Sequence, residues 1–100
     1  MNRFEVSCIN LAVKEGLGEV VTHMGNRAQG WCINEATAIQ WITRKREVYV
    51  VLNWSTGLRS LVGVARPEGK APLLRAHVDG KWNDDLMTQA RCGGKCRLNS

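Results

Sequence analysis

The sequence of 100 residues contains no long apolar run that would suit a membrane or an export signal. Its longest unbroken apolar run is Val48–Leu52, far short of the roughly 20 residues needed to cross a bilayer. The N-terminal segment is interrupted by Glu5 and Ser7, so no apolar stretch resembles a signal peptide. These absences predict a protein without membrane contact that resides in the cytoplasm.

The sequence also lacks the motifs of common catalytic sites. It has no glycine-rich phosphate loop, no Gly-x-Ser-x-Gly elbow and no His-Glu-x-x-His motif. Asp84-Asp85 is its one adjacent carboxylate pair, and adjacent residues on a helix or strand do not face one site. We interpret Asp84 or Asp85 as the cap of a short helix starting at Leu86. His23 and His77 have no local partner that suggests a general base, so we expect no enzyme and no small-molecule substrate.

Cysteine occurs four times, without two closely spaced pairs. Cys92 and Cys96 enclose Gly-Gly-Lys, a spacing that some zinc sites use, and further ligands could come from Cys8 or Cys32 or from a histidine. Against this, Cys8 falls on the inward face of an expected strand, where a free cysteine behaves as a small apolar residue. Cys32, next to Ile33, is interpreted as a small apolar residue too. A Cys92–Cys96 disulfide is disfavoured in a reducing cytoplasm. We therefore assign no metal ligand and no cofactor, and keep a metal-dependent fold as a minor alternative.

The composition is that of one soluble globular domain. Apolar residues make up 44% and charged residues 23% of the chain, values typical of soluble domains. The length leaves no room for two cores. We expect residues 1–92 to form one compact domain and residues 93–100 a polar C-terminal tail.

The first half predicts two strands and a helix. Residues 3–10 alternate apolar and polar side chains, which indicates a half-buried strand. Residues 11–18 read as a loop with two glycines, and the β-branched run 19–24 reads as a second strand, antiparallel to the first. After a turn at 27–30, Asn34 is a good N-cap for a helix over residues 34–42 with an apolar stripe.

The second half predicts three strands. Glu47–Trp54 contains the continuous apolar run Val48–Leu52 and no Gly or Pro, and it reads as a central strand. Leu58–Arg66 returns beside it, with Gly63 marking a bulge or a close backbone approach. Leu73–Val78 follows and ends in an Asp79-Gly80 turn. The order β-β-α-β-β-β predicts an α+β fold: a curved antiparallel sheet, or a small partly open barrel, packed by one short helix.

Positive charge is concentrated in the second half of the chain. The overall formal charge is +5, and residues 44–100 hold eleven Lys and Arg against five Asp and Glu. A basic region of this kind attracts nucleic acid or an acidic partner. The residues predicted to bind nucleic acid or a protein partner are Arg44, Lys45, Arg46, Arg59, Arg66, Arg75 and Trp82.

Four tryptophans are many for 100 residues. Bases of single strands stack on such rings while Arg and Lys hold the backbone, and tryptophan is also favoured at protein interfaces. We expect Trp41 and Trp54 to cap the core of this small domain. Trp31 and Trp82 remain open to either role.

The C-terminal third carries a set of motifs that resembles a known family. They are Leu73-Leu74-Arg75-Ala76, Asp79-Gly80, Asn83-Asp84-Asp85-Leu86-Met87 and Gln89-Ala90-Arg91-Cys92. Together with the opening Arg3–Asn10 and the helix Asn34–Ile42, they resemble the small bacterial and archaeal domain-of-unknown-function family 3892 over nearly residues 2–92. The chain has Leu73, Ala76 and Ala90 where that family usually has an aromatic residue, a threonine and a proline. The resemblance implies a compact α+β domain and implies no activity.

Two functional hypotheses follow from the sequence. In the first, the protein is a non-catalytic binding module whose basic second half contacts nucleic acid, with Trp54 or Trp82 adding stacking. In the second, it is a protein-interaction domain that uses a sheet edge or a Trp31/Trp82 surface. An example would be a phage or mobile-element inhibitor of a host defence complex, similar to an anti-CRISPR protein.

Overall fold

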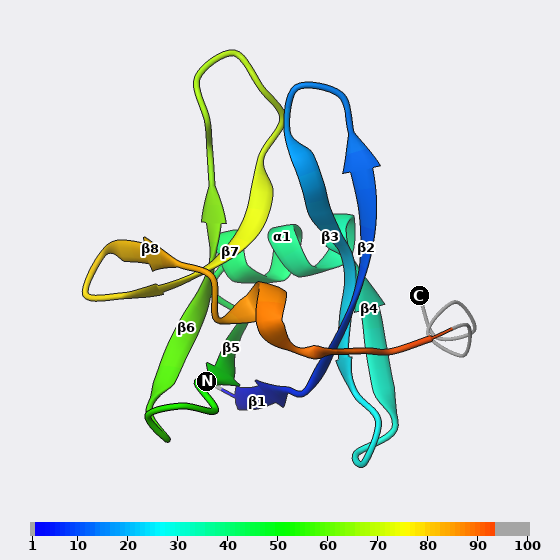
Figure 1. Ribbon diagram of the computed structural model, residues 1–100, viewed down its shortest axis with the longest axis vertical. Coiled ribbons are helices and arrows are strands. Elements are labelled where there is room, and N and C mark those ends of the chain that lie inside the picture. The colour runs from blue at the N-terminus through cyan, green and yellow to red at the C-terminus, as the bar shows by residue number, and fades with distance from the viewer. Residues whose placement is uncertain (1, 94–100) are drawn as a thin grey trace.

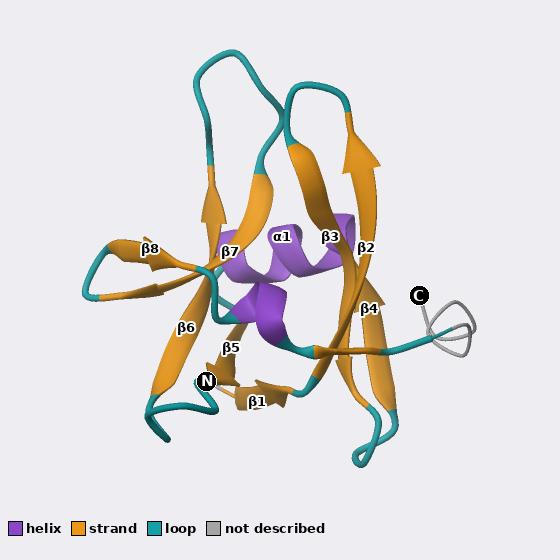
Figure 2. Cartoon of the chain, in the orientation of Figure 1, coloured by secondary structure: helices purple, strands orange, loops and turns teal. Residues whose placement is uncertain are grey.

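The computed structural model describes residues 2–93, which form two β-sheets and one α-helix (Figures 1 and 2). The five-stranded sheet has the order β1-β5-β6-β7-β8. Its strands are β1 (Asn2–Val6), β5 (Glu47–Leu52), β6 (Arg59–Ala65), β7 (Leu73–Val78) and β8 (Lys81–Asn83). The four-stranded sheet has the order β4-β3-β2-β9, with β4 (Trp31–Asn34), β3 (Gly18–Asn26), β2 (Cys8–Lys14) and β9 (Ala90–Arg91).

The N-terminal segment belongs to both sheets. β1 pairs with β5 in parallel, and β2 pairs with β3 antiparallel and with β9 in parallel. Ser7 lies between β1 and β2, and its backbone N–H donates to the Gly25 carbonyl at 2.8 Å. The α+β class is therefore correct, but the expectation of one antiparallel sheet is wrong. The two parallel pairings both involve strands near an end of the described chain. β1 lies beside β5 and β9 lies beside β2, whereas the strands between them pair as antiparallel hairpins.

Two segments differ from their sequence-based predictions. The loop predicted over residues 11–18 is shorter, since β2 continues to Lys14 and β3 begins at Gly18. The exposed Ala12 and Val13 of this hairpin lie beyond the core, where alternation no longer reports burial. Trp31–Asn34 forms a strand that was not predicted, antiparallel to β3. Four residues directly before a helix are too few to show a periodic pattern.

The helix α1 (Glu35–Thr43) starts where its N-cap predicts. The Asn34 side-chain oxygen accepts from the Thr37 N–H at 2.8 Å, which satisfies one of the free donors of the first turn. Ala38 on this helix is fully buried, and Ile39, Trp41 and Ile42 pack around the same core. The helix contacts strands of both sheets, and it crosses behind them in Figure 1.

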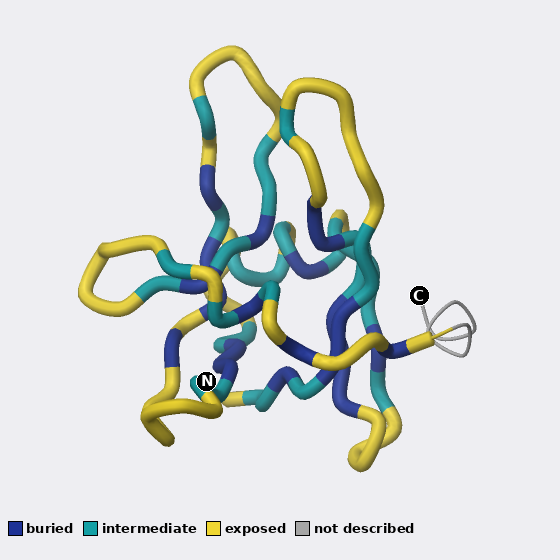
Figure 3. The backbone as a smooth tube through the Cα atoms, viewed as in Figure 1, coloured by how far each residue is buried: buried dark blue, intermediate teal, exposed yellow. Residues whose placement is uncertain are grey.

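One apolar core joins the two sheets, the helix and the short 3₁₀ turn η1 (Leu86–Thr88). Leu74 and Ala76 of β7 point into it, as their alternation predicts, and Leu86 is completely buried there. The core residues are Val6, Ile9, Val21, Met24, Ala38, Tyr49, Val51, Val62, Leu74, Ala76 and Leu86. In Figure 3 the buried stretches are inner parts of the chain, whereas the hairpin tips are exposed.

β5 is a central strand, as predicted, because β1 and β6 flank it. It ends at Leu52, and the loop that follows places Trp54 at 71% exposure. Trp41 packs against the core, so the prediction for it is confirmed, whereas the prediction that Trp54 caps the core is wrong. Among residues 2–93, no helix is both long and apolar enough to cross a membrane.

Candidate functional site

One face of the five-stranded sheet points away from the core and carries arginine and aromatic side chains. In the register of the sheet, Leu61 of β6 lies opposite His77 of β7, which lies opposite Trp82 of β8. Side chains that share such a row point to the same side of a sheet. Arg59 and Arg75 belong to this side because each lies two residues from a member of the row. We call Arg59, Leu61, Arg75, His77 and Trp82 the outer face.

Trp82 and His77 form a cross-strand pair at the centre of the outer face. Their ring centroids are 5.3 Å apart in an edge-to-face arrangement, a favourable geometry for two aromatic rings. A Cβ on Gly63 would lie 2.8 Å from the His77 ring, so only glycine lets that ring rest on the backbone of β6. The sequence predicted a bulge or a close backbone approach at Gly63, whereas the groups that approach it are the side chains of His77 and Trp82. Trp82 still exposes 44% of its surface.

Arg75 lies next to the exposed tryptophan. Its guanidinium carbon is 6.0 Å from the centroid of the Trp82 ring, within the range of a cation–π contact. An Arg75 nitrogen is also 3.4 Å from a carboxylate oxygen of Asp84, whose side chain is 82% exposed. Exposed ion pairs contribute at most about 1 kcal/mol. The guanidinium can therefore exchange Asp84 for another anion at small cost.

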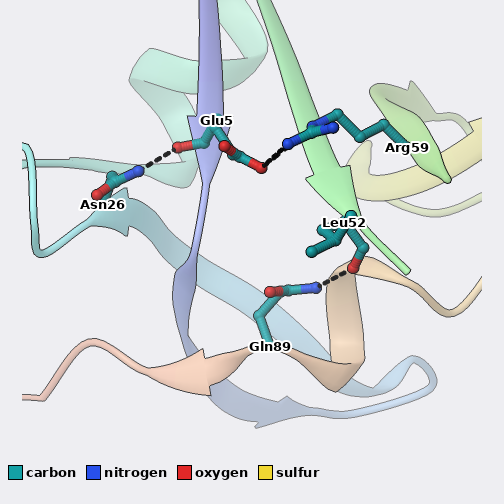
Figure 4. Close-up of polar contacts among 5 residues, drawn as sticks. All are labelled: Glu5, Asn26, Leu52, Arg59 and Gln89. Carbon is teal, nitrogen blue, oxygen red and sulfur yellow. Dashed lines mark hydrogen bonds and ion pairs between the residues drawn. The ribbon is translucent and has the colours of Figure 1, made fainter. Parts of the chain in front are cut away.

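Arg59 lies at another part of the same face and pairs with Glu5 of β1. Two of its nitrogens donate to one Glu5 oxygen at 3.1 and 2.9 Å (Figure 4). The Glu5 carbonyl accepts from the Asn26 amide at 2.9 Å, which ties β1 to the end of β3. A hollow of about 400 Å³ lies here, lined by Arg3, Glu5, Gln29, Val50 and Arg59.

The other four predicted binding residues do not join the outer face. Arg44, Lys45 and Arg46 form the exposed turn between α1 and β5. Arg66 follows β6 and donates to the Thr43 hydroxyl at 3.4 Å, which places it beside the end of α1. The seven residues thus form two separate groups. We call Arg44, Lys45, Arg46 and Arg66 the basic turn.

Trp31 belongs to an aromatic cluster at the core and not to the outer face. Its ring centroid is 5.8 Å from that of Phe4 and 5.8 Å from that of Tyr49. Burial, with a smaller effect of the Glu47 charge, raises the pKa of the Tyr49 phenol, so this hydroxyl stays protonated in neutral solution. The Trp31/Trp82 surface considered from the sequence is therefore not one continuous patch.

A partly buried polar network holds β8 in place beneath the outer face. Asp85 accepts from the Ser60 hydroxyl at 2.5 Å and from the Asn53 amide at 2.9 Å. The Asn83 amide donates to Ser60 at 3.0 Å, and the Gln89 amide donates to the Leu52 carbonyl at 3.0 Å (Figure 4). Asp85 does stand at the N-cap position of η1, but its side chain makes no capping bond. The predicted cap is thus wrong for Asp85, because Ser60 and Asn53 engage its carboxylate instead.

Replacement of Asp85 with alanine is expected to destabilise the protein by about 1.5–3 kcal/mol. The change leaves the Ser60 hydroxyl, 2% exposed, and the Asn53 amide without their acceptor, and hydrogen bonds to charged groups have this magnitude. Urea unfolding followed by circular dichroism measures the loss. Asp84→Ala is the matched control and should change the stability by less than about 1 kcal/mol. Equal effects of the two substitutions would contradict the role given to the network.

The cysteines do not follow the sequence-based interpretation. Cys8 is not a free apolar residue, since it forms a disulfide with Cys92. The alternative pairing of Cys92 with Cys96 is therefore wrong, and Cys96 itself lies outside the described residues, as does most of the predicted tail 93–100. No described cysteine is a free thiol. In this oxidised form, no group of three or more His, Cys, Asp or Glu within residues 2–93 is placed to hold a metal ion.

Two residues of the candidate site were not predicted from the sequence. Leu61 is an exposed member of the outer face, and the alternation Arg59, Leu61, Gly63 contains the signal for it. Glu5 was assigned only to a strand, and its pairing with Arg59 joins residues that are 54 positions apart. No local pattern reports a contact between such distant residues.

Comparison with known proteins finds no relative of this chain. No family model, no curated protein and no solved structure matches the chain. The resemblance to family 3892 stays a prediction. The function is therefore argued from the residues of the outer face and of the basic turn.

Proposed function

We propose that this chain is a non-catalytic module that binds single-stranded nucleic acid on its outer face. The observation that carries the proposal is the exposed Trp82 ring with Arg75 beside it on an open sheet surface. Single-strand-binding proteins combine an aromatic ring, on which a base stacks, with cations that follow the phosphates. An unpaired base offers its whole face to such a ring, whereas a base inside a duplex does not.

The arrangement around Trp82 suits a base with its neighbouring phosphate. The His77 ring packs against the Trp82 ring, so less side-chain freedom is lost when a base stacks on the tryptophan. Arg75 can give up its exposed contact with Asp84 for a phosphate oxygen. Arg59 offers a second guanidinium on the same face, where Glu5 now occupies it.

The basic turn supplies attraction over longer distances in this proposal. Its residues Arg44, Lys45, Arg46 and Arg66 are exposed. Clustered charges of one sign raise the local concentration of an oppositely charged ligand and speed its association. Their effect should therefore decrease strongly with salt, while stacking on Trp82 should not.

The two partners of the Arg75–Asp84 pair should have opposite effects on binding. Arg75→Gln is expected to weaken the binding of a fluorescein-labelled oligothymidylate and to reduce the salt dependence of log K by about 0.7, the value for one phosphate contact on a single strand. Asp84→Asn is expected to strengthen binding, because it removes a competing carboxylate. Fluorescence anisotropy at several salt concentrations measures both. Binding that is absent at low salt, or unaffected by salt, would refute the proposal.

A second candidate function is binding to a protein. Trp54 and Leu58 lie in the β5–β6 loop at 71% and 70% exposure, and exposed large apolar side chains of this kind mark protein interaction sites. A host protein complex, such as the target of an anti-defence protein, is the partner class suggested by the sequence. Affinity capture after nuclease treatment, with Trp54→Ser/Leu58→Ser beside Trp82→Ala, separates the two functions. Capture of one stoichiometric partner that only the first variant abolishes would favour the protein partner.

A further inference from the structure

One row of side chains crosses the five-stranded sheet from edge to edge on the side of the outer face. Each residue of this row lies opposite the next one on the neighbouring strand, and the five are Glu5, Val50, Leu61, His77 and Trp82. We call them the cross-sheet row. Neighbouring strands lie about 4.8 Å apart, so the four steps from β1 to β8 span about 19 Å. The row therefore offers more surface than one stacked base covers.

The middle of the cross-sheet row is apolar, and cations lie on both sides of it. Leu61 is exposed, and Val50 beside it is buried. Along the strand direction, Arg3 and Arg75 lie on one side of the row and Arg59 lies on the other. Bases of a bound single strand contact apolar and aromatic surface, while its phosphates follow cations. The row combines both chemistries over its whole length.

The end of the row opposite Trp82 holds a hollow that suits a phosphate group. This is the hollow of about 400 Å³ lined by Arg3, Glu5, Gln29, Val50 and Arg59. Arg3 is exposed, and within residues 2–93 it has no carboxylate partner. Two nitrogens of Arg59 already donate to an anionic oxygen there, which belongs to Glu5. A phosphate oxygen in that place would receive the same charge-assisted hydrogen bonds.

Glu5 can leave Arg59 without a change in the fold. Its side chain is 38% exposed, and exposed ion pairs add little stability. Its backbone stays fixed, because its carbonyl accepts from the Asn26 amide and β1 remains paired with β5. In Figure 4 the carboxylate points toward Arg59, whereas the carbonyl points the other way, toward Asn26. Only the side chain has to move.

We propose that the bound strand follows the cross-sheet row, so that one base stacks on Trp82 and a phosphate further along displaces Glu5 from Arg59. This second subsite rests on the function proposed above, and its cations are Arg3 and Arg59. The row has room for roughly four nucleotides, the lower end of the site sizes of single-strand-binding domains. A dinucleotide that binds at Trp82 and Arg75 does not reach the second subsite.

Oligothymidylates of two and four nucleotides test the second subsite. Each competes with a longer fluorescein-labelled oligothymidylate at about 0.15 M salt, where screening weakens the basic turn. The tetranucleotide is expected to bind at least about tenfold more tightly than the dinucleotide. Arg59→Gln should weaken tetranucleotide binding by about tenfold, the effect of one lost bond to a charged group, and dinucleotide binding by less than about twofold. Glu5→Gln should strengthen tetranucleotide binding by roughly threefold, because it removes a competing carboxylate.

Arg44→Gln is the matched control for these variants. It removes the same charge as Arg59→Gln, but from the basic turn and outside the cross-sheet row. It should weaken the binding of both lengths by one small factor. The gain expected from Glu5→Gln cannot result from misfolding, so it tests the subsite even where Arg59→Gln destabilises the protein.

Neutral linkages locate the phosphate that binds at Arg59. Methylphosphonate replaces one phosphate of the tetranucleotide at a time. One terminal linkage should weaken binding to the wild-type protein by about tenfold and leave binding to Arg59→Gln unchanged, because that variant has already lost the contact. Linkages that act equally on the two proteins would contradict the second subsite.

Trp82→Ala separates the second subsite from the function on which it rests. Weaker binding of both lengths to this variant, with a tetranucleotide advantage that needs Arg59, would support the path across the sheet. Equal affinity for the two lengths, or equal effects of Arg59→Gln on both, would overturn the path and leave binding at Trp82 intact. Binding of neither oligonucleotide, or binding unaffected by Trp82→Ala, would overturn both.

Discussion

Replacement of Trp82 with alanine is expected to weaken the binding of single-stranded DNA by about 5- to 150-fold. Stacking of a base on an aromatic side chain contributes about 1–3 kcal/mol, and each 1.4 kcal/mol corresponds to a factor of ten. The loss should be equally large at low and high salt, because stacking involves no phosphate. Anisotropy titrations of a labelled oligothymidylate at two salt concentrations measure it. A Trp82→Phe variant should retain most of the affinity, since it keeps an aromatic face.

Trp54→Ala is the matched control for this experiment. Trp54 is the more exposed of the two tryptophans, at 71% against 44%, but it lies in the β5–β6 loop and outside the outer face. Its removal should change the affinity less than twofold. Trp82 packs on His77 and Gly63, so the stability of both variants must be measured alongside. Equal losses of affinity from the two substitutions would mean that exposed aromatic area, and not the outer face, determines binding.

Removal of the Cys8–Cys92 disulfide is expected to cost the oxidised protein about 4–5 kcal/mol of stability. The bond joins residues 84 positions apart, and cross-links that close loops of this length restrict the unfolded chain most strongly. The variant Cys8→Ser/Cys92→Ser avoids leaving a single thiol. Urea unfolding in the presence of a chelator measures the loss in the free energy of unfolding. The same loss should lower the melting temperature of the variant by about 4–8 °C for each kcal/mol.

The hydrogen bonds beside the disulfide provide the comparison for this loss. Asn10→Ala removes both bonds to Gly93 but leaves the disulfide, and it should cost about 1–2 kcal/mol. A double cysteine variant no less stable than the Asn10 variant would show that the disulfide adds little. In that case, the hydrogen bonds to β2 hold the C-terminal segment.

Patterns that repeat within one element predicted the local structure well. Asn34 marks the start of the helix because a cap needs only the three residues after it. The alternation of Leu74 and Ala76 with Arg75 and His77 identified which side of β7 is buried. Gly63 indicated a bulge or a close backbone approach, although the groups that approach it are side chains.

Contacts between distant segments could not be read from the sequence. The parallel pairing of β1 with β5 joins residues about 45 positions apart, and the short strand β9 pairs with the still more distant β2. The Asp85 carboxylate was read as a helix cap because its real partners, Ser60 and Asn53, lie 25 and 32 positions away. The same reason explains why Cys8 was read as apolar, since its partner lies at the other end of the chain.

The candidate site was predicted in part. Arg59, Arg75 and Trp82 were named from charge and aromatic content, and they do share one face of the sheet. Arg66 was named with them, but it faces the end of α1. Charge counting cannot make this distinction, because it records how many cations a segment contains and not the side of the sheet on which each one lies.

Mapping of the bound strand on the protein tests the central claim most directly. Titration of the ¹⁵N-labelled protein with a short oligothymidylate, followed by two-dimensional NMR, reports the affected amides. If the strand binds on the outer face, the largest chemical-shift changes are expected at Leu61, Gly63, Arg75 and His77 and at the indole N–H of Trp82. Smaller and salt-sensitive changes are expected at residues 44–46. Shifts confined to residues 44–46, or no shift at the Trp82 indole, would contradict binding at the outer face.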